Sequence, residues 1–143
     1  LMDDIGGSMG PLYGSFFKTL WRQSRNYETI DAHLYLEMLK AATSSVKEIG
    51  GAKVGDKTLI DTLEPACVAF EQELNSGSGF DVALVKSIKG AEVGRDSTRE
   101  MIAQVGRSAR LGERSRGVLD AGAASSFIII ESMHTAILSI LHG

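Results

Sequence analysis

The sequence contains a single cysteine, Cys67, among 143 residues. One cysteine can form neither a disulfide within the chain nor a zinc site built from several thiolates. Its position in an apolar helical stretch predicts a buried structural thiol in a protein of a reducing compartment. The net charge is −3, with acidic and basic residues interspersed, so the chain lacks the broad positive field that holds a nucleic-acid backbone. Nucleic acid is therefore not an expected partner.

Long apolar runs are also missing. The longest, residues 66–70, is too short to cross a bilayer, and no basic region followed by a hydrophobic stretch opens the chain. We therefore expect a soluble, unexported protein of the cytoplasm that has no membrane partner. The length suits one domain, residues 1–143, with a real core. The chain opens on Leu-Met-Asp-Asp, without a first methionine or a helix cap, from which we expect an N-terminal part to be missing.

A convincing period-two strand pattern is absent, whereas apolar residues recur at helical spacing between glycine-bearing loops. This pattern predicts an all-α, antiparallel helical bundle or barrel. The expected helices cover residues 11–25, 31–49, from 56 or 57 to the Ser/Gly stretch at 76–79, 81–105, and from 121 or 122 to 141. Asp31, Asp56 and Asp120 stand where N-caps are expected, and Gly50 and Gly106 where helices should end.

The apolar stripes predict which residues each helix buries. Pro65 lies inside the third helix and should bend it, Gly90 and Gly94 suggest irregularities in the fourth, and the fifth looks almost wholly buried. The expected core residues, in chain order, are Leu12, Phe16, Leu20, Leu34, Met38, Ala42, Val46, Ile49, Leu59, Ile60, Leu63, Ala66, Val68, Phe70, Val82, Leu84, Val85, Ile88, Ala91, Met101, Ile102, Phe127, Ile130, Met133, Ile137 and Leu141.

Three glycine-bearing loops enter helix N-termini: residues 6–11, 50–58 and 107–122. Glycines let backbone N–H groups approach a ligand closely. In the last loop, Arg107, Arg114 and Arg116 supply cationic forks suited to phosphate oxygens, and the following helix offers its positive end. Short connections between antiparallel helices would bring alternate loops to one end of the bundle. The loops therefore indicate an anion site.

Plainer interpretations stand beside this one. The middle loop nearly matches a P-loop, but Asp56 separates Gly55 from Lys57, and a helix precedes it where a strand is required. A helix C-cap followed by an N-cap explains most of its residues without a ligand, and the three arginines also fit a solvated basic loop. The histidines, His33, His134 and His142, lack metal-ligand spacing and suit surface or packing roles.

Taken together, three ordered motifs resemble the L subunit of dihydroxyacetone kinases over nearly the whole chain. They are GGSMGPLYG at residues 6–14, GDKTLIDTLEPA at 55–66, and GRSARLGERS at 106–115 followed by Asp-Ala-Gly at 120–122. The resemblance implies an eight-helix barrel, incomplete here, that holds ATP or ADP with magnesium at one end. It implies nucleotide contacts for Gly7, Ser8, Met9, Gly50, Leu59, Arg107, Asp120, Ala121 and Gly122, with Gly50 and Leu59 beside the adenine and Arg107 at the phosphates.

The sequence departs from the family pattern in ways that bear on function. Met9 stands where Ser or Thr is usual, Arg110 where Tyr is usual, and Ala121 where Pro is usual. The last two resemble a subgroup acting on other sugars, which leaves the ketose open. A Gly-Asp-Gly-Asp-His-Gly type segment supplies the magnesium ligands in the family, and this sequence has no equivalent. The chain therefore offers no metal ligand of its own, and we assign it no catalytic residue.

The resemblance implies a kinase subunit that transfers a phosphoryl group to dihydroxyacetone or a related short ketose held by a separate partner subunit. A phosphotransferase-system donor protein would recharge resident ADP in some relatives, and a homodimer is a further partner option. By itself the chain is expected to be inactive. The alternative from a different class is a non-catalytic helical interaction module, in which the glycine loops are caps and the arginines contact a protein.

Overall fold

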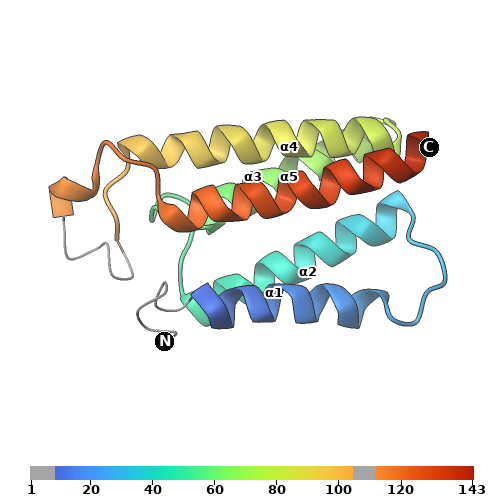
Figure 1. Ribbon diagram of the computed structural model, residues 1–143, viewed down its shortest axis with the longest axis horizontal. Helices are drawn as coiled ribbons and strands as arrows, with labels where there is room; N and C mark the ends of the chain where they lie inside the picture. The colour runs from blue at the N-terminus through green and yellow to red at the C-terminus, as the bar shows by residue number, and fades with distance from the viewer. Residues whose placement is uncertain (1–8, 105–111) are drawn as a thin grey trace.

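The computed structural model describes residues 9–104 and 112–143. Within these ranges the chain forms helices and no strand, which confirms the all-α prediction. The helices are α1 (Met9–Ser24), α2 (Ala32–Gly50), α3 (Ile60–Asn75), α4 (Phe80–Ser97) and α5 (Ala121–His142), with a short 3₁₀ helix η1 (Thr98–Glu100) after α4. Figure 1 shows them side by side as long rods, with α1 beside α2 and α5 beside α4.

The alternating directions of the helices sort the connections into two groups (Figure 1). One end holds the start of α1, the connection from α2 to α3, the connection from α4 to α5, and the start of α5. The other end holds the turns between α1 and α2 and between α3 and α4, together with the C-terminus. The parts of the glycine-bearing loops that the structure describes, residues 9–11, 50–58 and 112–122, therefore share one end, which we call the loop end.

The core lies between the helices and is built from most of the predicted stripes. Phe16, Val46, Phe70, Leu84 and Ile130 are buried, as expected. Tyr35 and Leu39 are buried although the spacing argument did not select them. Other expected core residues are exposed to solvent, namely Ile49, Val68, Val82, Val85 and Leu141.

Helix α5 is less buried than its composition predicts. Ile128 and Ile140 are 61% and 78% exposed, so the expectation of an almost wholly buried helix is wrong. By length and composition alone α5 could cross a membrane, and it alone among the described residues passes that test, although the core helix of a soluble protein passes it too. Counting uninterrupted apolar runs missed this property, because short polar stretches at residues 125–126, 131–132, 134–135 and 139 divide the sequence of α5.

Helices α3 and α4 pack with almost no space between their backbones. A methyl group on Gly94 would lie 2.0 Å from the carbonyl oxygen of Asp61, and one on Gly90 would lie 2.8 Å from that of Pro65. Pro65 has no N–H to donate to the Asp61 carbonyl, four residues earlier in α3. Gly94 therefore lies against the carbonyl that Pro65 leaves without its helical partner. Both glycines lie within the continuous helix α4, so they mark close packing and not the expected irregularities.

A chain of polar side chains crosses the apolar core. The Ser87 hydroxyl donates to the carbonyl of Ala66 at 2.8 Å and lies 3.0 Å from Nε2 of His134. Nδ1 of His134 lies 3.0 Å from the Tyr35 hydroxyl. Because Ser87 has one proton and gives it to Ala66, His134 Nε2–H donates to Ser87, and Nδ1 accepts from Tyr35. His134 is therefore a packed and fully hydrogen-bonded histidine.

Candidate functional site

The loop end brings together the predicted site residues that the structure describes. A methyl group on Gly122 would lie 3.3 Å from Cε of Met9, and one on Gly50 would lie 3.5 Å from Cδ2 of Leu12, in the first turn of α1. Leu59, which immediately precedes α3, is 4% exposed and belongs to the hydrophobic core. The remaining predicted residues, Gly7, Ser8 and Arg107, lie outside the described residues.

Tyr13 fastens α1 to the first turn of α5. Its hydroxyl lies 3.4 Å from the carbonyl of Gly122 and also contacts the hydroxyl of Ser125. Burial raises the pKa of Tyr13, so this hydroxyl stays protonated over the physiological range. The contact holds the start of α1 against Gly122, at the place where two of the three motifs meet.

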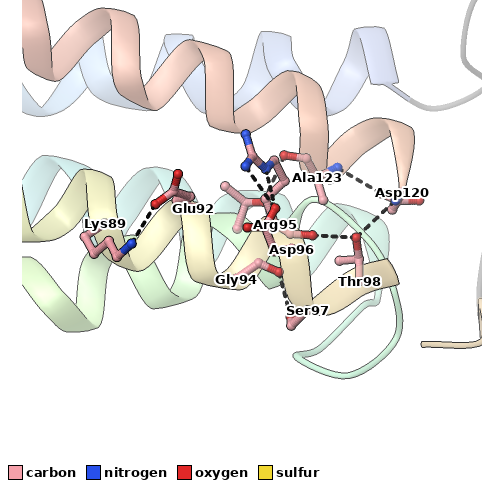
Figure 2. A network of polar contacts seen from close by, with 10 residues as sticks. Lys89, Glu92, Gly94, Arg95, Asp96, Ser97, Thr98, Asp120 and Ala123 are labelled. Atoms are coloured by element: carbon pink, nitrogen blue, oxygen red, sulfur yellow. Dashed lines mark hydrogen bonds and ion pairs between the residues drawn. The ribbon is translucent and has the colours of Figure 1, made fainter. Parts of the chain in front are cut away.

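Asp120 caps α5, as the sequence predicts. Its Oδ2 accepts from the N–H of Ala123 at 2.9 Å, and its own N–H donates to Oγ1 of Thr98 at 3.1 Å (Figure 2). Burial raises the pKa of the Asp120 carboxyl, while the Ala123 N–H and the charge of Lys57 act in the opposite direction. The carboxylate therefore caps the helix, and the positive end of α5 faces the loop end.

The connection from α2 to α3 is a tightly hydrogen-bonded turn. The two carboxylate oxygens of Asp61 accept from the N–H groups of Gly55 at 2.7 Å and Thr58 at 2.8 Å. Asp56 accepts from the N–H of Lys53 at 3.0 Å and caps no helix. Because these groups bond to side chains, and Lys57 has φ +63°, the helix begins at Ile60. The predicted start at 56 or 57, with Asp56 as its cap, is wrong.

Left-handed backbone also corrects the predicted end of α2. Gly50 is the last helical residue, and Gly51 follows with φ +68°, its N–H donating to the carbonyl of Lys47. Gly51 is therefore the residue that needs the conformational freedom of glycine. At the other boundary, Asp31 caps α2 as predicted, accepting from the N–H of Leu34 at 2.8 Å.

After the short 3₁₀ helix η1 the chain is not helical at residues 101–104, contrary to the prediction of a helix to residue 105. Helix α4 ends at Ser97, and Met101 already has an extended backbone. The N–H of Ala103 donates to the buried hydroxyl of Ser115 at 2.9 Å, and the N–H of Gln104 donates to the carbonyl of Asp56 at 3.1 Å. The first bond lies within the connection from α4 to α5, and the second joins that connection to the one before α3. The helical pattern of Met101 and Ile102 could not reveal either bond.

The arginines of the predicted clamp have different surroundings. Arg116 pairs with Glu113 at 3.0 Å and donates from Nε to the carbonyl of Glu100, so its guanidinium helps to fold the loop. Arg114 is exposed, and Arg107 lies outside the described residues. At the end of α4, the Arg95 guanidinium lies 4.4 Å from the ring centroid of Phe127 and so links α4 to α5. Arg95 also pairs with its neighbour Asp96 (Figure 2).

Lys57 is the residue that the sequence analysis missed. Its side chain is almost completely buried, and its Nζ donates to the carbonyl of Thr98 at 2.5 Å and to that of Val118. Burial lowers the pKa of Lys57, while Asp120 and Glu100 act in the opposite direction. The signal in the sequence was weak, because a lysine in a glycine-bearing loop usually points to solvent.

Among residues 9–104 and 112–143, no cluster of three His, Cys, Asp or Glu residues could hold a metal ion. The carboxylates at the loop end are already committed to backbone N–H groups, as the bonds of Asp56, Asp61 and Asp120 show. Mg²⁺ prefers free carboxylate oxygens together with substrate phosphates and water. The described residues therefore do not fit a magnesium site of their own.

Comparison with known proteins identifies the family. The DAK2 domain family matches residues 1–135, and the chain belongs to it. The chain is 34% identical over 133 residues to a Listeria innocua protein named PEP-dependent dihydroxyacetone kinase 1, ADP-binding subunit DhaL, covering 93% of this chain and 61% of that one. The Escherichia coli ADP-binding subunit DhaL of PEP-dependent dihydroxyacetone kinase is 31% identical, with 95% of this chain and 65% of that one covered.

A third relative is named for a different substrate. L-erythrulose kinase of Pectobacterium atrosepticum is 30% identical over 137 residues, which cover 96% of this chain and 23% of that protein. The chain thus spans less than two thirds of the length of each of these three curated relatives.

Proposed function

We propose that this chain is a nucleotide-binding part of a kinase that phosphorylates a short ketose. The observation that carries the proposal is the meeting of separate glycine-bearing motifs at one end of the bundle, where the Met9 side chain lies beside Gly122 at the capped start of α5. Relatives that cover nearly all of the chain are named ADP-binding subunits of dihydroxyacetone kinases. The occupant of the loop end is therefore ADP or ATP.

The residues at this end suit both the adenine of a nucleotide and its ribose and phosphates. Gly50 and Leu59 would border the adenine, because a glycine surface and a buried aliphatic side chain accept a flat apolar ring. Gly7, Ser8, Met9, Ala121 and Gly122 would lie along the ribose and phosphates, where backbone N–H groups and the positive end of α5 favour negative charge. Arg107 would supply a guanidinium to the phosphates.

In this proposal the chain binds and orients the nucleotide, and a partner subunit holds the ketose. The terminal hydroxyl of the ketose attacks the γ-phosphoryl group, and the leaving oxygen remains on ADP. Magnesium, when bound, neutralises phosphate charge. Its ligands would lie outside the described residues. Dihydroxyacetone and erythrulose are both consistent with the relatives' names, and the cytoplasmic location expected from the sequence remains a prediction.

The decisive experiment is a titration of the chain with ADP and magnesium, followed by calorimetry and by thermal unfolding. Binding to the folded state alone stabilises it by about 2.7 kcal/mol when free ligand is 100 times Kd. Arg107→Ala should weaken binding, whereas Arg22→Ala, an exposed arginine in the last turn of α1, should not. If ADP neither binds to nor stabilises the unaltered chain, the nucleotide proposal is wrong and the interaction-module alternative is favoured.

A second measurement addresses the source of the phosphoryl group. Relatives named PEP-dependent or PTS-dependent carry an ADP-binding subunit, and in such a design we infer that ADP stays bound between turnovers. The chain purified without added nucleotide would then release ADP on denaturation, at up to one equivalent by chromatography. Recovery of a nucleotide-free chain that binds ATP in rapid exchange would point instead to ATP as a dissociating co-substrate.

A further inference from the structure

Lys57 has an unusual combination of properties for a lysine. It is buried, it has a left-handed backbone with φ +63°, and it occupies the connection between α2 and α3. A residue with a side chain is disfavoured in this conformation, which glycine and asparagine adopt more readily. The burial and the backbone both act against lysine at this position, so its side chain must provide an interaction that other residues cannot.

That interaction joins separate parts of the loop end. Nζ of Lys57 donates to the carbonyl of Thr98, which follows α4, and to the carbonyl of Val118, which precedes α5. Thr98 in turn accepts the N–H of Asp120 on its hydroxyl and donates that hydroxyl to the carbonyl of Arg95 (Figure 2). The N–H of Gly117 donates to the carbonyl of Arg99 at 2.6 Å. Hydrogen bonds to Lys57, Thr98 and Arg99 thus hold the connection that leads into α5.

We propose that Lys57 is a positioning residue. Its Nζ joins the connection before α3 to both ends of the connection between α4 and α5, and it thereby holds the turn at residues 120–122 in its nucleotide-binding geometry. The inference rests on the proposed function. Lys57 acts through backbone carbonyls and not on the reacting atoms. Without the tether the turn would sample other arrangements, and the apparent Kd would equal the intrinsic Kd divided by the fraction of molecules in the competent arrangement.

The test uses Lys57→Asn with Lys53→Asn as its matched control. Asparagine suits the left-handed backbone, so the variant removes the tether while easing the conformational cost. Lys53 lies in the same connection, with its side chain 80% exposed and paired with Asp56, so its variant removes the same charge and leaves the tether. Affinity for ADP with magnesium is measured by calorimetry well below the unfolding temperature, and amide hydrogen exchange is measured without nucleotide.

We expect Lys57→Asn to raise the Kd for ADP by about tenfold or more, and Lys53→Asn to change it by less than about twofold. Exchange at the amides of residues 117–123 should accelerate in Lys57→Asn alone. Unchanged affinity or unchanged exchange in Lys57→Asn would overturn the inference. If the unaltered chain does not bind ADP, the proposed function fails, whereas the exchange measurement still decides whether Lys57 holds the turn.

A chemical rescue separates the hydrogen bonds from simple packing and covers the case in which Lys57→Asn fails to fold. In the double variant Lys57→Cys, Cys67→Ser, the unfolded chain is alkylated with 2-bromoethylamine, which rebuilds a lysine-length ammonium, or with 1-bromopropane, which gives a neutral chain of the same length. After refolding, the aminoethyl form should restore slow exchange and ADP affinity, and the propyl form should not. Equal restoration by both forms would refute a role for Nζ.

Discussion

At the scale of single residues, His134 shows how burial sets a charge state. Burial lowers the pKa of His134 to about 4, and its two ring nitrogens are used by Ser87 and Tyr35. The neutral Nε2–H form satisfies both partners, whereas a proton on Nδ1 would face the oxygen that now donates to it. The ring is therefore expected to be the neutral Nε2–H tautomer at pH 7, which nitrogen chemical shifts would identify.

His134 also makes stability depend on pH. Because its folded pKa is about 4 and an unfolded histidine titrates near pH 6.5, the unfolded chain binds the proton first. The contribution of His134 to stability is therefore present above about pH 6.5 and decreases as the pH falls toward 4, by about 2.5 kcal/mol at pH 4.5. Urea unfolding at pH 7 and pH 4.5 should show this loss in the unaltered chain.

The variants for this prediction differ only in which histidine they remove. His134→Gln can still accept from Tyr35 and donate to Ser87, so it should fold and lose less stability between pH 7 and pH 4.5. His33→Gln removes an exposed histidine of α2 and should keep the full pH dependence of the unaltered chain. The assignment to His134 is wrong if both variants lose stability with pH in parallel.

Two aspartates with the same local role allow helix capping to be separated from ligand binding. Asp120 caps α5 at the loop end and Asp31 caps α2 at the other end, each through a carboxylate that accepts a backbone N–H three residues later. Either change to Ala should cost about 1 kcal/mol of unfolding free energy. We expect Asp120→Ala alone to weaken ADP binding, as measured by calorimetry on both variants. Equal effects on binding would remove Asp120 from the site.

At the scale of elements, helical periodicity predicted the number and approximate positions of the helices, and local caps fixed several ends. Asp31 and Asp120 act as predicted because an N-cap is a local device. The start of α3 and the end of α4 failed because side chains there occupy backbone N–H groups, which periodicity does not show. Asp61 holds the N–H groups of Gly55 and Thr58 and delays α3, and Ser115 takes the N–H of Ala103 after α4 has ended.

The burial of a side chain could be predicted only in helices that bury one apolar face and expose the other. Val82 and Val85 of α4 are apolar yet exposed, whereas the face of α4 that lies against α3 carries Gly90 and Gly94. Lys57 is the opposite case, because this charged residue is buried at a place where its Nζ donates to two backbone carbonyls. Periodicity contains no information on which face of a helix meets a neighbour or on which distant carbonyl needs a donor.

The contact between α3 and α4 provides the prediction at this scale. Gly94→Ala would place a methyl group 2.0 Å from the carbonyl oxygen of Asp61, and neither backbone can move without separating the helices. The expected loss of unfolding free energy is about 3 kcal/mol or more. Gly14→Ala in α1 is the control, because nothing lies within 4 Å of the added methyl group and alanine favours a helix by up to about 1 kcal/mol.

Chemical denaturation of the two variants would measure both changes. A loss in Gly94→Ala beside a gain in Gly14→Ala would attribute the effect to the close approach of the helices. Similar small changes in both would show that α3 and α4 are farther apart than the structure has them. Because Asp61 also organises residues 55–58, Gly94→Ala should in addition accelerate amide exchange in that connection.

At the scale of the whole molecule, the antiparallel helices place the described parts of the three motifs at one end and the turns between α1 and α2 and between α3 and α4 at the other (Figure 1). The family membership agrees with this division, since the match covers residues 1–135 and includes all three motifs. Packing of α3 against α4 and capping of α5 fix the helix ends that support the loop end. Hydrogen bonds of Lys57, Thr98 and Tyr13 join the segments of the loop end to one another. The ends of the bundle should therefore respond differently to a nucleotide.

Amide hydrogen exchange with and without ADP and magnesium would test that asymmetry. A ligand at the loop end should slow exchange at residues 9–13, 51–59, 98–104 and 112–123, because it both covers these amides and stabilises the connections. The far end, residues 25–31 and 76–80, should exchange as before under conditions in which local opening dominates. Uniform slowing along the chain would indicate global stabilisation only, and protection confined to the far end would contradict the placement of the nucleotide.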